Sequence, residues 1–77
     1  MVNVLKLKAK LVENGKNVDY LAESLEVNRT TIYRKLAAGG DDFTIGEVDK
    51  ISQVLKLSVA DINSIFFSQY VAPQATD

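Results

Sequence analysis

The sequence predicts an all-α fold of five short helices in one compact domain, and three observations support this prediction. Apolar residues recur at intervals of three and four along most of the chain, which is the period of an amphipathic helix. Residues whose side chains can cap a helix precede these periodic stretches, namely Asn3, Asn17, Asn28, Thr44 and Ser58. Glycines stand where the helices would end, at Gly15, Gly39 and Gly40.

In chain order, we expect the first helix after Asn3, the second over Val18 to Leu25, and the third from Asn28 to the glycine pair. The fourth helix opens with a complete capping box from Thr44 to Glu47, and the fifth with a weaker version at Ser58. The expected core consists of Val4, Leu7, Leu11, Leu21, Leu25, Val27, Ile32, Leu36, Val48, Ile51, Leu55, Ile62 and Phe66. Residues 1–71 are expected to form the domain, and residues 72–77 a disordered tail.

Composition argues against several classes of protein. The chain of 77 residues makes one small core, which buries only about 60% of the surface of the unfolded chain. It contains no cysteine and no histidine, so we expect no disulfide, metal, cofactor or small-molecule substrate, and no enzyme activity. Because it has neither a long apolar run nor a signal peptide, we expect a cytoplasmic protein with no membrane partner.

Between Asn17 and Gly40 the pattern is that of two short helices joined by a three-residue turn. Leu21 and Leu25 are spaced to face a core, and Ala22 is small enough to lie where two helices cross. This layout is typical of a helix-turn-helix, in which the first helix braces against DNA and the second enters the major groove.

The segment AESLEVNRTTIYRKL, from Ala22 to Leu36, resembles the helix-turn-helix of the phage repressor and Cro family. With residues 42–47 and 63–67, the chain is similar over residues 3–70 to small regulators of Gram-positive phages and prophages. The resemblance implies a compact, lambda-repressor-like DNA-binding domain. Two positions depart from the family pattern: Glu26 stands where a glycine commonly ends the first helix in a left-handed conformation, at a cost of about 1 kcal/mol. Val18 replaces a glutamine that usually touches a phosphate, so that contact is not expected here.

Net charge is −1, but it is unevenly distributed. Up to Leu36 there are seven basic and four acidic side chains, whereas from Ala37 onward two basic side chains face six acidic ones. The excess of positive charge therefore falls on the half that carries the helix-turn-helix, as expected for a protein that binds a polyanion.

The third helix supplies the candidate base-reading residues. At about 100° per residue, an inward Ile32 turns Thr30 and Arg34 to the opposite side and Tyr33 to a flank. Arg29 lies nearer the inward side, but it is long and stands in the protruding first turn. Arginine pairs bidentately with guanine, and threonine suits a thymine methyl group or a base edge. The resemblance points to the same four positions.

Phosphate contacts are expected from Lys35, at an exposed position, and from Lys10. The free amides at the starts of the second and fourth helices, near Asn17 and Thr44, are further candidates. The alternative at Thr44, which the acidic pair before it favours, is that Asp41 and Asp42 neutralise the start of the fourth helix.

The C-terminal stretch from Ile65 to Val71 carries more apolar surface than a small domain can bury, because Phe66 and Phe67 diverge by about 100° on a helix. One outlet is a homodimer interface formed by Phe67, Tyr70 and Val71, which would match a palindromic operator. The other is that Tyr70 or Val71 folds back over the first helix.

These observations predict a sequence-specific transcriptional regulator, Cro-like or repressor-like, that binds a double-stranded DNA operator as a dimer and occludes a promoter. A second hypothesis is a small modulator that uses the same scaffold to bind a repressor, a toxin or another protein. A third is that the chain is the DNA-binding domain of a longer repressor. The basic outer face from Arg29 to Lys35 favours DNA.

Overall fold

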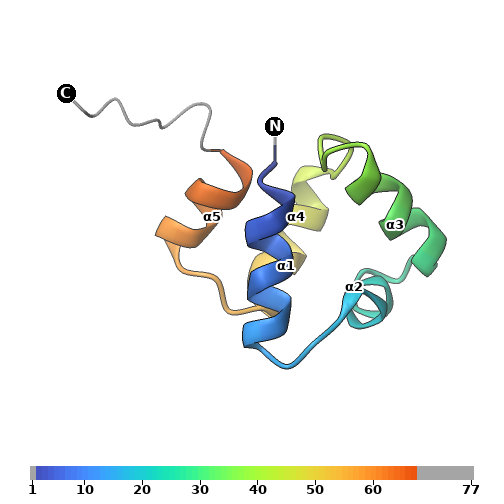
Figure 1. Ribbon diagram of the computed structural model, residues 1–77, viewed down its shortest axis with the longest axis horizontal. Coiled ribbons are helices and arrows are strands. Elements are labelled where there is room, and N and C mark those ends of the chain that lie inside the picture. Colours follow the sequence, from blue (N-terminus) through green and yellow to red (C-terminus); the bar gives the residue numbers. More distant parts are fainter. Residues whose placement is uncertain (1, 68–77) are drawn as a thin grey trace.

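The computed structural model describes residues 2–67 of the chain, and within that range it consists of five α-helices and no strand. The helices are α1 (Val4–Glu13), α2 (Val18–Leu25), α3 (Arg29–Ala37), α4 (Ile45–Val54) and α5 (Val59–Phe66). Figure 1 shows α1 crossing the middle of the molecule, with α5 to one side of it and α2 and α3 to the other. The predicted all-α architecture of five helices is confirmed. The predicted tail and the predicted roles of Tyr70 and Val71 lie outside the described residues.

Every helix begins at the capping residue that the sequence predicts. The side chains of Asn3, Asn17, Asn28, Thr44 and Ser58 each accept a hydrogen bond from the backbone amide three residues later. Thr44 and Glu47 form the predicted capping box. Ser58 and Asp61 also form a complete box, so the second one is stronger than predicted. These caps satisfy amides that a helix cannot pair internally, which is why they determine where each helix starts.

The core lies where α2 packs against α3 and α4 and where α1 packs against α5. Its buried members are Leu7, Leu11, Leu21, Ala22, Ile32, Leu36, Ile51, Leu55, Ile65 and Phe66. Ala22 is buried in α2, the helix that contacts both α3 and α4, which agrees with the prediction that a small side chain lies at a helix crossing.

The predicted core needs two corrections. Val4, Leu25, Val27, Val48 and Ile62 are only half-buried around its rim. Ile65, which the prediction omitted, is fully buried, and its carbonyl accepts a hydrogen bond of 2.7 Å from the amide of Asn3. Apolar residues cover a wide arc of the short α5, so its sequence does not show which of them is buried most deeply. The packing of α1 against α5 decides this.

The end of α2 has the unusual backbone that the sequence predicts. Glu26 adopts φ 60° and ψ 39°, which is the left-handed conformation expected for this position. Its conformation lets the amide of Val27 bond to the carbonyl of Ala22 at 3.0 Å and turns the chain toward α3. Lys56, after α4, adopts φ 54°, a second left-handed residue that no prediction anticipated.

We expect Glu26→Gly to stabilise the domain. Glycine removes the steric cost of the left-handed backbone, and the greater freedom of the unfolded chain offsets only part of this gain. The net effect should be about 0.5–1 kcal/mol, or a rise of several degrees in the midpoint of thermal unfolding. Glu23→Gly, one turn earlier in a right-handed helix, is the matched control and should destabilise. A Glu26→Gly protein that melts below the wild type would contradict this account of the turn.

Candidate nucleic-acid interface

Helix α3 presents a polar outer face at one edge of the molecule. Ile32 and Leu36 are buried on its inner side, while Thr30, Tyr33 and Arg34 are exposed. Figure 1 places α3 at the periphery, where α2 supports it from one side. The structure therefore gathers three of the four predicted base-reading residues on one solvent-facing surface, as the angular argument predicted.

Arg29, the fourth of these residues, is engaged with the preceding helix. Its Nη1 atom lies 3.2 Å from Oδ2 and 3.3 Å from Oδ1 of Asp19, in the first turn of α2. Both side chains are more than half exposed, and an ion pair of this kind contributes only about 0–1 kcal/mol. Arg29 can therefore exchange Asp19 for another hydrogen-bond acceptor at little cost.

Lys35 does not occupy the exposed position that was predicted for it. Its side chain is 13% exposed, and its Nζ atom lies 2.7 Å from Oε1 of Glu47, whose side chain is 18% exposed. The physical reason is angular: Lys35 follows Ile32 by three residues, which turns it only about 60° away from the inward direction. Its stem therefore runs along the domain toward α4. The predicted phosphate contact requires an exposed ammonium, and the structure directs this ammonium to a carboxylate instead.

Lys10 is also committed to carboxylates. Its Nζ atom lies 3.2 Å from Glu13 of the same helix and 3.4 Å from Asp61, so the pair joins α1 to α5. The hydrogen bond to Glu13 raises the pKa of Lys10, burial opposes this, and the charges of Asp61 and Glu13 raise it further, so this pKa lies above its usual value. This arrangement accounts for Lys10 as a contact between helices and makes it a weaker candidate for binding phosphate than predicted.

The starts of α2 and α4 are capped by their own side chains, and each carries an acidic residue in its first turn, Asp19 and Glu47 respectively. Asn17 and Thr44 each accept a hydrogen bond from their own helix, so a phosphate would meet the neighbouring free amides rather than these side chains. Beside the start of α2 lies a cation that the sequence reasoning did not assign. The Nζ atom of Lys16 stands 4.5 Å from the ring centroid of Tyr20, which holds the ammonium close to this helix end. The sequence did carry a signal for this cation, because Lys16 directly precedes the capping residue Asn17.

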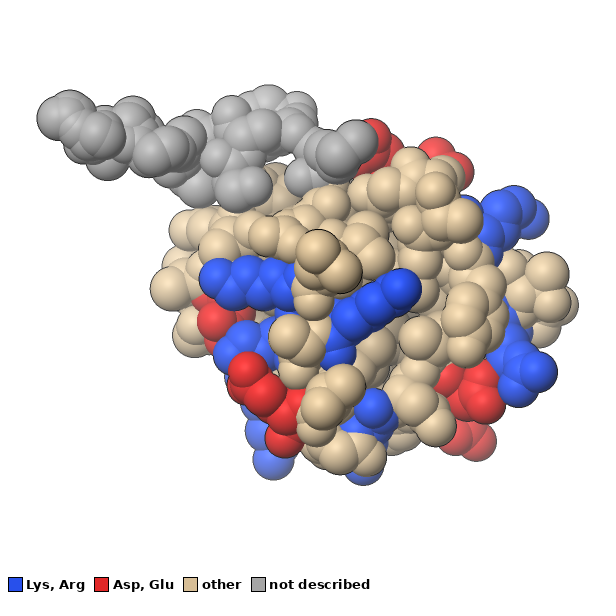
Figure 2. Space-filling model, viewed as in Figure 1, with Lys and Arg blue, Asp and Glu red and all other residues tan. Residues whose placement is uncertain are grey.

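Pairing reduces the basic character predicted for α3. In the described part of the chain, Arg34 is the one cation of α3 without a carboxylate partner, because Arg29 pairs with Asp19 and Lys35 with Glu47. Figure 2 shows basic and acidic side chains interspersed, and at the edge that carries α3 they lie beside one another. The continuous basic face predicted from Arg29 to Lys35 is therefore wrong, and the free positive charge of this helix is concentrated at Arg34.

The surroundings of Glu47 keep its carboxyl group ionised and so favour its ion pair with Lys35. Burial by itself raises the pKa of Glu47, but the hydrogen bonds from Lys35 and Thr44 and the charge of Lys35 outweigh it and leave this pKa below its usual value. The carboxyl group is therefore ionised at neutral pH. Two donors hold it in place, and it fixes the end of α3 against the start of α4.

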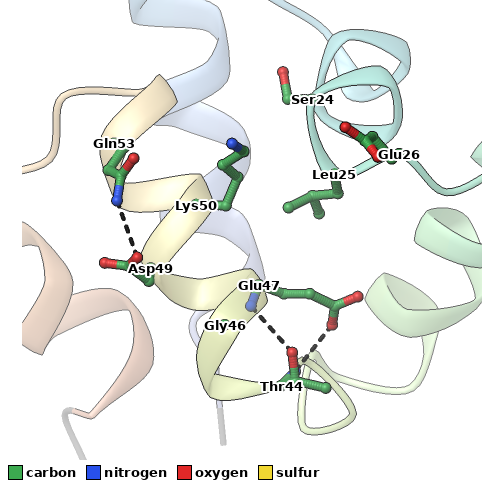
Figure 3. Close-up of a pocket in the computed structure, with 9 residues that line it drawn as sticks. All are labelled: Ser24, Leu25, Glu26, Thr44, Gly46, Glu47, Asp49, Lys50 and Gln53. Carbon is green, nitrogen blue, oxygen red and sulfur yellow. Dashed lines mark hydrogen bonds between the residues drawn. The ribbon is translucent and has the colours of Figure 1, made fainter.

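A polar hollow of about 410 Å³ is lined by the last turn of α2 and by α4. Figure 3 shows Ser24 and Leu25 on one side and Lys50 extending from α4 on the other, with Asp49 hydrogen-bonded to Gln53. Carboxylates of Glu26, Glu47 and Asp49 also line it. Within residues 2–67, no buried side-chain polar atom lacks a hydrogen-bond partner. The hollow therefore offers no unpaired buried group that would recognise a small ligand.

Comparison with protein-family models, with curated proteins and with solved structures gave no match. Among the described residues there is no cluster of acidic side chains able to hold a metal ion. None of the described helices combines the length and the apolar character needed to cross a bilayer. The function must therefore be argued from the geometry of α3 and its surroundings.

Proposed function

We propose that this chain is a sequence-specific DNA-binding transcriptional regulator, Cro-like or repressor-like. In this proposal its five helices form a lambda-repressor-like domain in the cytoplasm of a bacterial host, and it occludes a promoter by binding a palindromic operator as a homodimer. The observation that carries the proposal is the outer face of α3, where Thr30, Tyr33 and Arg34 lie exposed on a helix supported by α2. A helix of this width fits the major groove, and its hydroxyl and guanidinium groups match the edges of bases there.

The surface of α5 supports the dimeric part of the proposal. Phe66 is buried, whereas Phe67, at the end of α5, is 39% exposed, with its ring centroid 6.4 Å from that of Phe66. A second copy covering Phe67 would remove this apolar surface from water. Two-fold symmetry would then present two copies of α3 to a palindromic site.

Binding to DNA is expected to weaken steeply with salt. If a dimer neutralises about six phosphates, the logarithm of the association constant should fall against the logarithm of salt concentration with a slope near −5. The measurement is a fluorescence titration of the full chain against the neighbouring intergenic DNA and against unrelated duplex at several salt concentrations. An absence of binding at low salt, or an association constant that does not change with salt concentration, would refute the proposed function.

A second candidate, a modulator that binds a protein, is favoured by a different observation. Leu5 and Val12 are 80% and 76% exposed, and their spacing of seven residues places them on one face of α1. An apolar stripe of this kind suits a protein partner better than a polyanion. If Leu5→Lys abolishes biological activity while DNA binding is unaffected, this candidate is supported over the first.

A further inference from the structure

We propose that Lys35 is a positioning residue: through its ion pair with Glu47 it sets the orientation of α3 relative to the start of α4, and thereby the accuracy with which Arg34 meets a base. The inference rests on the proposed DNA-binding function. It makes base discrimination depend on Glu47, which lies on α4 rather than on the helix that reads the bases.

One carboxylate oxygen makes the connection. Oε1 of Glu47 accepts a hydrogen bond of 2.7 Å from Nζ of Lys35 and another of 2.9 Å from the backbone amide of Thr44. The amide of Glu47 in turn donates to Oγ1 of Thr44 at 3.0 Å. The last turn of α3 is therefore tied directly to the capping box of α4, whose own geometry is fixed by two reciprocal bonds.

The surroundings make this pair more rigid than an exposed one. The ammonium of Lys35 also lies 5.7 Å from the ring centroid of Phe43, which belongs to the loop between α3 and α4. That loop has little room to adjust, since a Cβ atom at Gly40 would stand 2.7 Å from Cβ of Val2. The pair is thus held between a capping box and a tightly packed loop, whereas the pair of Arg29 with Asp19 is open to water.

Helix α3 needs such a directional contact. Its buried side chains, Ile32 and Leu36, pack by non-directional apolar contact, which opposes withdrawal of the helix more strongly than a small rotation about its axis. Arg34 precedes Lys35 by one residue, so any rotation that Lys35 permits is passed on to the guanidinium at the end of a long side chain. A bidentate contact with a base tolerates little displacement, because both hydrogen bonds need near-linear geometry.

The test compares Lys35→Met, Glu47→Gln and the double variant with the wild-type full chain. The probes are a duplex selected by the wild type from random-sequence DNA and single-base variants of that duplex. Glutamine retains the oxygen that caps α4 but removes the charge that holds Lys35. We expect each single variant to lower discrimination at one base position by about tenfold, a typical size for coupling between contacting residues. The double variant should lose no more than either single one, because both act through one contact.

The salt slope separates this role from direct contact with phosphate. A positioning residue can be lost without changing the slope, whereas the loss of one phosphate contact in each half-site makes the slope shallower by about 1.8. Asp61→Asn, which breaks the ion pair between α1 and α5 but keeps an oxygen that can cap α5, controls for general loss of stability and should keep wild-type discrimination. Thermal unfolding is measured for all variants. If Lys35→Met fails to fold, Glu47→Gln alone carries the test, because it keeps the capping box.

Three outcomes overturn the inference. In the first, Glu47→Gln keeps wild-type discrimination. In the second, Lys35→Met weakens all sequences alike and makes the salt slope shallower, which would restore Lys35 as a phosphate contact while leaving the proposed function standing. In the third, the wild type selects no sequence and binds no duplex, and the proposed function fails together with the inference.

Discussion

Arg34→Ala is expected to weaken binding to the preferred duplex by about 1–3 kcal/mol per half-site and to relax sequence preference at one base position. Arg34 is the exposed cation of α3 that has no carboxylate partner among the described residues, so its guanidinium is available to a base. The measurement is a titration against the preferred duplex, each single-base variant and unrelated DNA. Because the side chain is exposed, the midpoint of thermal unfolding should stay close to that of the wild type.

Arg34→Lys is the matched control, since it keeps the charge and removes the planar fork. A lysine binds a phosphate through its charge nearly as well as an arginine, but it cannot pair bidentately with guanine. We expect Arg34→Lys to preserve the salt slope. It should lose discrimination between bases to the same extent as Arg34→Ala. If Arg34→Lys instead keeps full discrimination, Arg34 contacts only the backbone, and base reading must reside in Arg29, Thr30 and Tyr33.

Phe67→Glu is expected to convert a dimer into a folded monomer that binds a palindromic site far more weakly. The aromatic ring is partly exposed at the end of α5, and a carboxylate there would have to be buried without a partner if the interface formed. Sedimentation equilibrium with and without the preferred duplex measures the change directly. The weaker binding follows because each monomer must then find its half-site independently.

Val59→Glu provides the control for this substitution. Val59 is an exposed apolar residue at the opposite end of the same helix, where a carboxylate is compatible with the helix dipole. It should leave the assembly unchanged. A wild-type chain that stays monomeric at high concentration and on DNA would remove the interface at Phe67, and dimerisation by Val59→Glu and Phe67→Glu alike would place any interface elsewhere.

The sequence alone determined where the helices begin. Capping depends on a side chain and an amide three residues apart, so Asn3, Asn28 and Thr44 carry their structural role within a single turn. The left-handed backbone of Glu26 was expected from the resemblance carried by residues 22–36, because a glutamate by itself gives no local signal for that conformation. The outward direction of Thr30 and Arg34 followed from the helical repeat once Ile32 was taken as buried.

Only the tertiary structure decided which charges pair with one another. Lys35 and Glu47 are twelve residues apart, Arg29 and Asp19 ten, and Lys10 and Asp61 meet across α1 and α5. A pattern of residues assigns a side chain to a face of its own helix, but it does not reveal which group of another helix that face meets. The complete burial of Ile65 could not be predicted for the same reason. Helix boundaries depend on contacts within one turn, whereas ion pairs and burial depend on how the helices are packed, and here the packing moved most of the expected positive charge of α3 into contacts with α2 and α4.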